Sequence, residues 1–350
     1  MKVVSIVGAR PQFIKAAAIS KTLRQLHSEV LVHTGQHYDY QMSGIFFDGL
    51  DLPQPDVYLG VGSDSHGKQT AAMLRGIEDV LVTEHPDWVL VYGDTNSTLA
   101  GALAASKLSI SVVHVEAGLR SFNRCMAEEI NRVVADHLSN LLLCPSQTAV
   151  RHLANEGITQ NVYDVGDVML DVLNWARYKR QMRPPLVATR LGLSRKRYLV
   201  ATVHRSENTD DVARLAQILN AFNSLSEPIV FALHPRTRKA LCQTQLKVKN
   251  HVHLVDPVGY LDMVSLVQDA RLVLTDSGGL QKEAYWLKVP CITMRAQTEW
   301  VETVQVGWNR LVGTEWKDIV EAVESFVPNE DHPELYGSGN TAGRCIELLY

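Results

Sequence analysis

Short apolar runs rich in β-branched residues alternate along the chain with stretches whose apolar positions have helical spacing. Two such stretches, Pro11–Leu26 and Thr95–Ser106, predict helices, and Pro11 suits the first turn of the earlier one. Continuous apolar runs that are joined by helices are typical of a parallel sheet covered on both faces. The strands predicted in this part of the chain are Lys2–Val7, Glu29–Thr34, Trp88–Tyr92, Ser111–Val115 and Leu141–Cys144.

The same alternation begins again near residue 168, and a charged segment with prolines at Lys179–Pro185 interrupts it. The strands predicted in the second half are Tyr198–Thr202, Ile229–Leu233, His253–Val255, Leu272–Thr275 and Pro290–Met294. The helices predicted between them are Asp211–Asn223, Leu261–Asp269 and Leu280–Leu287. A second parallel sheet therefore follows the first along the chain.

We predict an α/β fold of two doubly wound, Rossmann-like domains that face each other across a cleft. The first domain covers residues 1–168 and the second 169–335, with a hinge near Gly166–Asp171. Residues 336–350 are expected to form a helix that packs on the first domain. Because ligands of such sheets bind outside the carboxyl ends of the strands, the residues that follow each strand are the first candidates for chemistry.

Composition excludes several classes of protein. Of the 350 residues, 46% are hydrophobic and 21% charged, and the net charge is −4, which fits a globular protein and argues against disorder. This charge offers no general attraction to nucleic acid or anionic membrane surfaces. The five cysteines are scattered without a C-x-x-C pair, which favours a reducing cytoplasm over a disulfide framework or zinc site. No apolar run is long enough to span a membrane.

The first strand leads into Gly8-Ala9-Arg10-Pro11-Gln12-Phe13-Ile14-Lys15. This turn lacks the G-x-G-x-x-G pattern of dinucleotide sites. It places Arg10 at a helix N-terminus and Lys15 about one turn further on, so two cations and free backbone N–H groups could bind an anion. The alternative is that both side chains are solvated on a helix surface.

Three acids follow strands or open a helix in the first half: Asp94, Glu116 and Glu128. Each has an ordinary alternative, since Asp94 could cap a helix and Glu128 could pair with a helix dipole. Together they are expected at one end of one sheet. Carboxylates that share a partly desolvated site acquire different pKa values and can serve as acid and base.

The second half places a histidine after each of two strands, His204 and His234, which could be structural or lie at a functional site. The segment Thr275 to Glu283 contains Ser277, Gly278 and Gly279 directly before a helix. Glycines let a phosphate approach the backbone, the helix N-terminus supplies N–H donors, and Glu283 could accept hydrogen bonds from ribose hydroxyls. The alternative is a tight turn with a serine cap.

The sequence has neither metal-ligand spacing nor the dinucleotide pattern, so we predict no metal and no cofactor. Asp136-His137 is interpreted as a pair of helix-surface positions, and His251-Val252-His253 as strand alternation.

These residues closely resemble the non-hydrolysing UDP-N-acetylglucosamine 2-epimerase family over nearly the whole chain. The motifs that carry the resemblance are Gly8 to Lys15, Thr34-Gly35-Gln36-His37, Gly93-Asp94-Thr95, His114 to Arg120, Glu128-Glu129-Ile130-Asn131-Arg132, His204-Arg205 with Glu207-Asn208, and Asp276 to Glu283.

The resemblance implies a glycosyltransferase-B-like architecture with UDP in the cleft between domains, and no need for nicotinamide or metal. It implies interconversion of UDP-GlcNAc and UDP-ManNAc by anti elimination of UDP, which gives 2-acetamidoglucal, followed by re-addition. It also implies a cytoplasmic homodimer that serves cell-surface polysaccharide synthesis.

The resemblance further assigns roles to residues. Asp94, Glu116 and Glu128 would move protons at C2, and His204 would assist departure of UDP. The remaining candidates would bind substrate: Arg10, Lys15, His234, Ser277, Gly278, Gly279 and Glu283.

Some positions depart from the common family pattern. The loop between Glu116 and Glu128 is two residues shorter, Ala127 replaces a proline, and Thr298 to Glu302 reads T-E-W-V-E instead of T-E-R-P-E. These features are similar to the branch that acts on UDP-2,3-diacetamido-2,3-dideoxy-glucuronate, whose carboxylate Arg120 or Arg124 could bind. Further alternatives are a glycosyltransferase, a hydrolysing epimerase and a catalytically silent nucleotide-sugar sensor.

Overall fold

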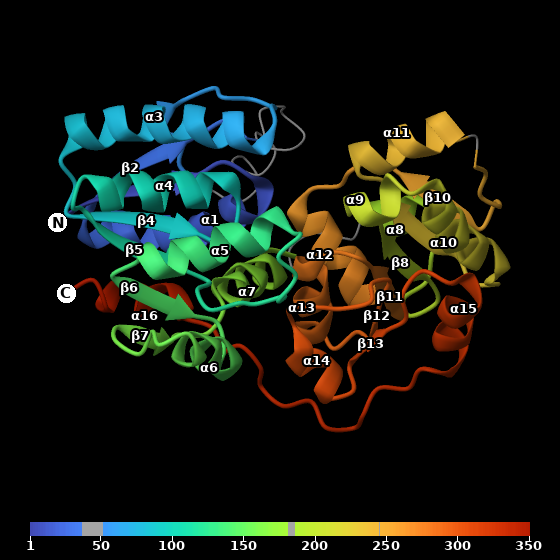
Figure 1. Ribbon diagram of the computed structural model, residues 1–350. Helices are drawn as coiled ribbons and strands as arrows, with labels where there is room; N and C mark the ends of the chain where they lie inside the picture. Colours follow the sequence, from blue (N-terminus) through green and yellow to red (C-terminus); the bar gives the residue numbers. More distant parts are fainter. Residues whose placement is uncertain (37–51, 181–185, 245) are drawn as a thin grey trace. The chain divides into compact units, whose positions relative to one another are not determined.

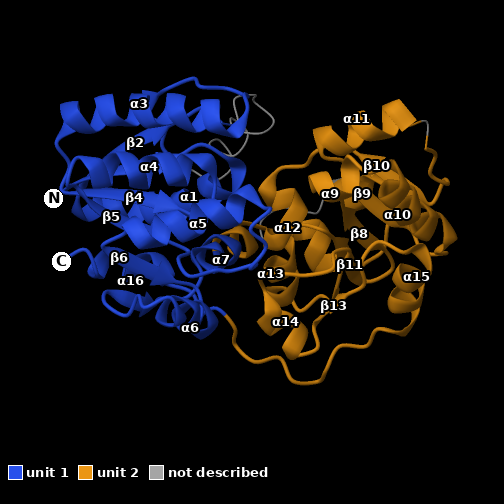
Figure 2. Ribbon diagram, viewed as in Figure 1, with its two compact units in different colours: residues 1–174, 336–350 blue, residues 175–335 orange. Residues whose placement is uncertain are grey.

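A computed structural model describes residues 1–36, 52–180, 186–244 and 246–350 of the chain (Figure 1). The chain forms two compact units, one of residues 1–174 with 336–350 and the other of residues 175–335 (Figure 2). His37, the last residue of the motif that begins at Thr34, lies outside the described residues, as do residues 181–185 of the charged interruption.

The first unit is built on a seven-stranded sheet in which all neighbouring strands are parallel. Its strands are β1 (Lys2–Val7), β2 (Ser28–His33), β3 (Val57–Tyr58), β4 (Trp88–Tyr92), β5 (Ser111–Val115), β6 (Leu141–Cys144) and β7 (Val162–Asp164). Their order is β3-β2-β1-β4-β5-β6-β7, so the direction of winding reverses between β1 and β4. In doubly wound sheets a ligand site lies at such a switch point.

Helices cover both faces of this sheet. They are α1 (Arg10–Leu26), α3 (His66–Glu84), α4 (Asn96–Lys107), α5 (Ala127–Leu138), α6 (Gln147–Asn155), α7 (Val168–Arg180), whose last turns belong to the second unit, and α16 (Thr341–Glu347). Figure 1 shows α3, α4 and α5 side by side, and their apolar residues share one core with Val4 and Ile6 of β1. Ser5 points to the other face, where its carboxylate partner Glu29 also binds Ser20 of α1.

Small residues allow close packing where the switch point is formed. A Cβ at Gly101 of α4 would lie 2.9 Å from a side-chain carbon of Val91 and 3.2 Å from one of Ile6. A Cβ at Gly8, directly after β1, would lie 2.1 Å from the Thr34 hydroxyl and 2.2 Å from that of Ser97. The turn after β1 is therefore held tightly against its neighbours.

The second unit is built on a six-stranded parallel sheet. Its strands are β8 (Leu199–Thr202), β9 (Ile229–Ala232), β10 (Val252–Val255), β11 (Leu272–Thr275), β12 (Cys291–Thr293) and β13 (Asn309–Leu311). Its helices are α8 (Leu186–Arg190), α9 (Ser206–Thr209), α10 (Val212–Ser224), α11 (Pro235–Thr244), α12 (Tyr260–Asp269), α13 (Gly278–Trp286), α14 (Val301–Gln305) and α15 (Trp316–Ser325). The strand order β10-β9-β8-β11-β12-β13 places the switch point between β8 and β11.

The predicted α/β class with two doubly wound sheets is confirmed, and each predicted strand is present to within one residue at either end. The sequence did not indicate β3, β7 and β13, which lie at sheet edges and span only two or three residues. Strands of that length carry too few apolar positions for a recognisable pattern.

The chain returns to the first unit at its end, where α16 packs against α1. The carboxylate of Asp171 accepts hydrogen bonds from the backbone N–H groups of Thr341 and Ala342 at the start of α16. In the part of the chain that the structure describes, every helix falls short of the length or apolarity needed to cross a membrane.

Candidate active site

Gln12 ties together the turns that follow β1 and β4. Its side-chain oxygen accepts hydrogen bonds from the backbone N–H groups of Gly8 (2.8 Å) and Ala9 (3.0 Å). Its amide nitrogen donates to the carbonyl of Tyr92 (2.9 Å) and to the hydroxyl of Thr98 (3.1 Å). Because Gln12 is fully buried, these bonds fix the position of the first turn of α1, which carries Arg10.

Lys15 of α1 forms an ion pair with Glu116, which directly follows β5. The Lys15 side chain is 6% exposed and that of Glu116 is 10% exposed. Glu116 adopts a left-handed backbone conformation (φ +71°), as does Gly93 (φ +62°), which directly follows β4. A Cβ at Gly93 would lie 3.1 Å from Nζ of Lys15, so a glycine leaves room for this pair.

Asp94 also has a cationic partner. One nitrogen of the Arg132 guanidinium on α5 contacts the Asp94 carboxylate, and another lies 3.1 Å from Glu129. The amide of Asn131 donates to the backbone carbonyl of Asp94 at 3.0 Å. Since β4 and β5 are paired, with Tyr92 opposite Val115, Asp94 and Glu116 follow adjacent strands at the same edge of the sheet. The structure therefore brings together two of the three predicted acids.

Glu128 differs from those two acids. It lies in the first turn of α5, is exposed, and makes no hydrogen bond or ion pair with the residues that the structure describes. Its neighbour Glu129 is buried and accepts hydrogen bonds from the backbone N–H groups of Ser121 and Phe122. Through these bonds Glu129 fixes the loop before α5, the loop that is two residues shorter than in the common family pattern.

A buried network lies beneath these turns. Nδ1 of His114 lies 2.7 Å from Oδ1 of Asp136, and Nε2 of His114 lies 2.7 Å from the carbonyl oxygen of Gly93. Although burial favours the neutral acid, His114 and then Arg120 outweigh it and lower the pKa of Asp136. The prediction that Asp136 lies on a helix surface is wrong, because Asp136 is only 1% exposed and faces the sheet.

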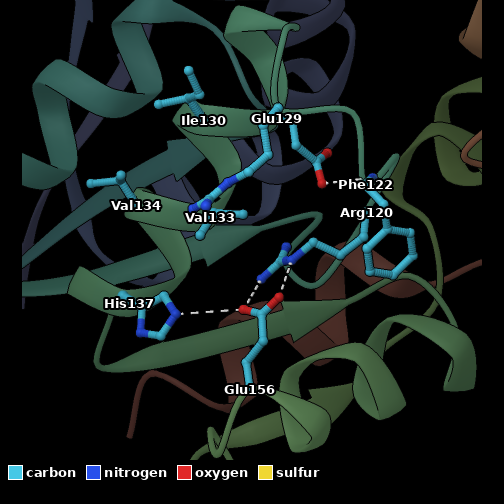
Figure 3. Close-up of a pocket in the computed structure, with 9 residues that line it drawn as sticks. Arg120, Phe122, Glu129, Ile130, Val133, Val134, His137 and Glu156 are labelled. Atoms are coloured by element: carbon cyan, nitrogen blue, oxygen red, sulfur yellow. Dashed lines mark hydrogen bonds and ion pairs between the residues drawn. The ribbon is translucent and has the colours of Figure 1, made fainter.

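Arg120 belongs to this network. Its guanidinium binds Asp136 at 2.6 Å and makes two bonds of 2.7 Å to Glu156, and its side chain is 1% exposed. Figure 3 shows Arg120 turned toward Glu156, which also faces His137, along a cavity of about 420 Å³. Arg120 is therefore a poor candidate for binding a substrate carboxylate, in contrast to the exposed Arg124.

We did not predict this buried network, although one feature of the sequence indicates it. Glu129, Arg132 and Asp136 recur at i, i+3 and i+7 on α5, and all three are buried. A stripe of charged residues with helical spacing, in a helix next to strands, indicates charges paired inside the protein.

In the second unit, Asp276 organises the turn that carries His204. The Asp276 carboxylate is fully buried and accepts hydrogen bonds of 3.0 Å from the backbone N–H groups of His204 and Arg205, as well as one from the amide of Asn208. Asp276 follows β11 and His204 lies just after β8, so the pair spans the switch point of this sheet. The ring centroids of His234 and His204 lie 5.4 Å apart.

The segment with Ser277, Gly278 and Gly279 forms the start of α13, as predicted. Ser277 is the N-cap, and its hydroxyl accepts a hydrogen bond from the N–H of Leu280. Gly278 and Gly279 are the first residues of the helix, and Glu283 lies in its second turn with 6% exposure. The uncapped N–H groups of this turn and the helix dipole favour an anion here.

Charged and aromatic groups surround Gly278. A Cβ there would lie 3.2 Å from the indole nitrogen of Trp300 and 3.9 Å from Arg205 and Glu299. Burial disfavours the charged form of Glu299, but its ion pair with Arg295 outweighs this and lowers the pKa of Glu299 to about 2. Glu299 is therefore a carboxylate that keeps Arg295 in place at neutral pH.

Among the described residues, no group of three or more His, Cys, Asp and Glu side chains is arranged to hold a metal ion.

Comparisons with known proteins agree over the whole chain. The family described as UDP-N-acetylglucosamine 2-epimerase matches residues 21–350. A UDP-N-acetylglucosamine 2-epimerase homolog of Methanococcus maripaludis is 53% identical, and the match covers 100% of this chain and 99% of the relative. The UDP-2,3-diacetamido-2,3-dideoxy-D-glucuronate 2-epimerase of Pseudomonas aeruginosa is 49% identical, with the same coverage.

A solved structure supports the same relationship. The crystal structure of Methanocaldococcus jannaschii UDP-GlcNAc 2-epimerase in complex with UDP-GlcNAc and UDP has a TM-score of 0.94 to this chain at 42% identity. The similarity covers 100% of this chain and 99% of that one. These matches and the two doubly wound sheets show that the chain belongs to the UDP-N-acetylglucosamine 2-epimerase family, a family of isomerases.

Proposed function

We propose that this protein interconverts UDP-GlcNAc and UDP-ManNAc without hydrolysis. UDP leaves by anti elimination to give 2-acetamidoglucal and then adds back after C2 is protonated on the opposite face. The observation that carries the proposal is that Asp94 and Glu116 follow adjacent strands and that each is paired with a cation. Inversion at C2 requires a proton to leave one face and another to arrive at the opposite face, which needs more than one acid–base group.

The first unit supplies the proton-transfer groups in this proposal. Ion pairs with Lys15 and Arg132 hold Glu116 and Asp94 in place, and a carboxylate held in this way can act as a base. Glu128 is exposed, so its carboxyl group can exchange protons with water. Asp94, Glu116 and Glu128 together provide the groups that remove and return the C2 proton.

The second unit supplies the groups that hold UDP. The α13 N-terminus, with Ser277, Gly278 and Gly279, binds phosphate, and Glu283 binds the ribose. His204 assists departure of the diphosphate, and His234 lies beside it. Arg10, at the N-terminus of α1 in the first unit, adds positive charge for the leaving group, as does Lys15.

A second substrate is favoured by a specific observation. The relative from Pseudomonas aeruginosa that is named for UDP-2,3-diacetamido-2,3-dideoxy-D-glucuronate is 49% identical. This identity lies between those of the Methanococcus maripaludis UDP-N-acetylglucosamine 2-epimerase homolog (53%) and the Methanocaldococcus jannaschii UDP-N-acetylglucosamine 2-epimerase (42%). Arg124 is exposed in the shortened loop and provides a cation for the carboxylate of such a sugar. In this alternative the chemistry at C2 is the same and only the sugar differs.

Incubation in deuterated water tests the reaction and the substrate together. The protein is given UDP-GlcNAc or the diacetamido-glucuronate nucleotide, and NMR follows C2. Deuterium at C2 together with the 2-epimer supports the proposal and identifies the substrate. Release of free sugar would instead indicate a hydrolysing enzyme, and no exchange with either nucleotide would contradict 2-epimerisation. Arg124→Gln should lower kcat/KM only for the substrate that carries the carboxylate.

The biological setting completes the proposal. The protein acts in the cytoplasm as a homodimer and supplies a sugar nucleotide for cell-surface polysaccharide. The five scattered cysteines, none of them in a disulfide, are compatible with a reducing compartment. Sedimentation velocity at micromolar protein tests the dimer, which a monomer mass would contradict.

A further inference from the structure

His114 occupies an unusual position under the two turns that carry Asp94 and Glu116. Its side chain is fully buried on β5, where its strand neighbours in register are Val91 of β4 and Leu142 of β6. Both of its ring nitrogens lie 2.7 Å from an oxygen atom, one of Asp136 and the other the carbonyl of Gly93. Each of these distances is that of a strong hydrogen bond.

The two oxygens determine where the hydrogens of the ring must be. A backbone carbonyl can only accept, so Nε2 of His114 carries a hydrogen. The Asp136 carboxylate also receives the guanidinium of Arg120 (2.6 Å) and the N–H of Gly118 (3.2 Å), and these donors stabilise its ionised, accepting form. Nδ1 must then carry a hydrogen as well, and an imidazole with both hydrogens is positively charged.

The charges around the network agree with a cation at this position. Arg120 is shared between Asp136 and Glu156, so one guanidinium faces two carboxylates. A second positive charge on His114 completes the pairing of the buried Asp136. The nearby thiol on β6 is neutral, since burial raises the pKa of Cys144.

The other face of Gly93 adjoins the Lys15–Glu116 pair. A Cβ on Gly93 would lie 3.1 Å from Nζ of Lys15 and 3.4 Å from Oε2 of Glu116. The Gly93 peptide is thus held between His114 on one side and that ion pair on the other, and Asp94 is the next residue.

We propose that His114 is an imidazolium that acts as a positioning residue: through the Gly93 carbonyl it fixes the orientation of Asp94. This role rests on the proposed function, in which Asp94 moves a proton at C2. His114 itself does not touch the substrate. Its contribution is to the geometry of the group that does.

The charge is tested by NMR of the resting protein, without turnover. In protein labelled with ¹⁵N histidine, His114 should show two protonated ring nitrogens at about pH 8, where an ordinary histidine is neutral. The spectrum of His114→Gln identifies its signals. If that variant does not fold, at least one of the 13 histidine rings of the wild-type protein must still be doubly protonated at that pH, and a spectrum without such a ring overturns the proposal. A single protonated nitrogen at that pH would overturn the proposal.

The positioning role is tested by kinetics of the C2 exchange reaction. His114→Gln can keep a bond to Gly93 or to Asp136 but loses the charge, so kcat should fall by about 100-fold while KM stays near its wild-type value. His137→Gln is the matched control, since His137 is half exposed and lies 3.5 Å from Glu156 of the same network.

The outcomes separate this proposal from the proposed function. A wild-type kcat in His114→Gln would refute the positioning role. If the wild-type protein exchanges no C2 proton at all, the proposed function fails, yet the NMR result still decides the charge of His114.

Discussion

Lys15 and Glu116 form a buried ion pair although they are 101 positions apart in the sequence. The pair joins the first helix, which follows β1, to the end of β5, so it spans the switch point between β1 and β4. Lys15 was expected to meet an anionic ligand, and in this structure its cation is paired with one of the candidate acids. In the proposed reaction, an ammonium group held there would stabilise the negative charge of the leaving diphosphate.

Substitution should distinguish the three candidate acids from ordinary surface carboxylates. Asp94→Asn, Glu116→Gln and Glu128→Gln should each lower the rate of C2 exchange by at least about 100-fold, the low end for acid–base groups. The rate of deuterium incorporation from deuterated water measures this. Glu78→Gln, on the exposed side of α3, is the control that should retain the wild-type rate. Near-wild-type exchange in all three variants would refute their assignment.

Asp276 should stabilise the second unit and shape the turn of His204, which we propose to lie at the UDP site. In Asp276→Asn the new amide cannot accept from all the donors that the carboxylate satisfies, so the free energy of unfolding should fall by about 1–3 kcal/mol. Tryptophan fluorescence during urea unfolding reports mainly on this unit, because five of the six tryptophans lie in residues 175–335.

UDP affinity should fall in the same variant, because the backbone around His204 loses its buried acceptor. Calorimetric titration with UDP measures this. Asp256→Asn is the matched control, since the Asp256 side chain is 85% exposed. Equal effects of the two substitutions would contradict the assigned role of Asp276.

Gly8 should not tolerate a side chain. In Gly8→Ala the added Cβ would meet the hydroxyls of Thr34 and Ser97 at 2.1 and 2.2 Å, and overpacking of this kind costs about 1–3 kcal/mol in the free energy of unfolding. Thermal unfolding followed by circular dichroism measures the loss. Gly67→Ala is the control, because Gly67 lies in α3 with no atom within 4 Å of the added Cβ, and alanine favours the helix. Destabilisation by both substitutions alike would show that the close contact at Gly8 is not the cause.

The Arg295–Glu299 pair should make stability depend on pH in the acidic range. The pKa of Glu299 is lowered from 4.5 to about 2, so the stability it contributes is complete above its unfolded pKa and is lost as pH falls toward about 2. Glu299→Gln should reduce the free energy of unfolding by about 3 kcal/mol at neutral pH.

The difference in the free energy of unfolding between Glu299→Gln and wild type should shrink steadily as the pH falls below the unfolded pKa of Glu299. Urea unfolding at neutral pH and at about pH 3 compares the two conditions. Glu321→Gln, with a side chain 72% exposed, should show no such dependence. A difference between Glu299→Gln and wild type that is equal at both pH values would contradict the linkage.

The sequence by itself determined the two α/β halves and the place of each motif in them. Apolar runs such as Trp88–Tyr92 are long enough to show their strands, and Gly, Ser and Asp mark the turns that follow, because these signals are local. For the same reason the sequence alone places Asp94 after its strand and Ser277 at the start of α13.

Only the tertiary structure decided how the charges are partnered. The pairs Lys15–Glu116 and Asp94–Arg132, and the burial of Asp136 against His114, join residues from different elements. A helix of alternating charge looks alike in sequence whether its acids face water or a strand. Which of its faces is buried depends on the packing of α5 on the sheet, and that packing made Asp136 internal while it left Glu128 exposed.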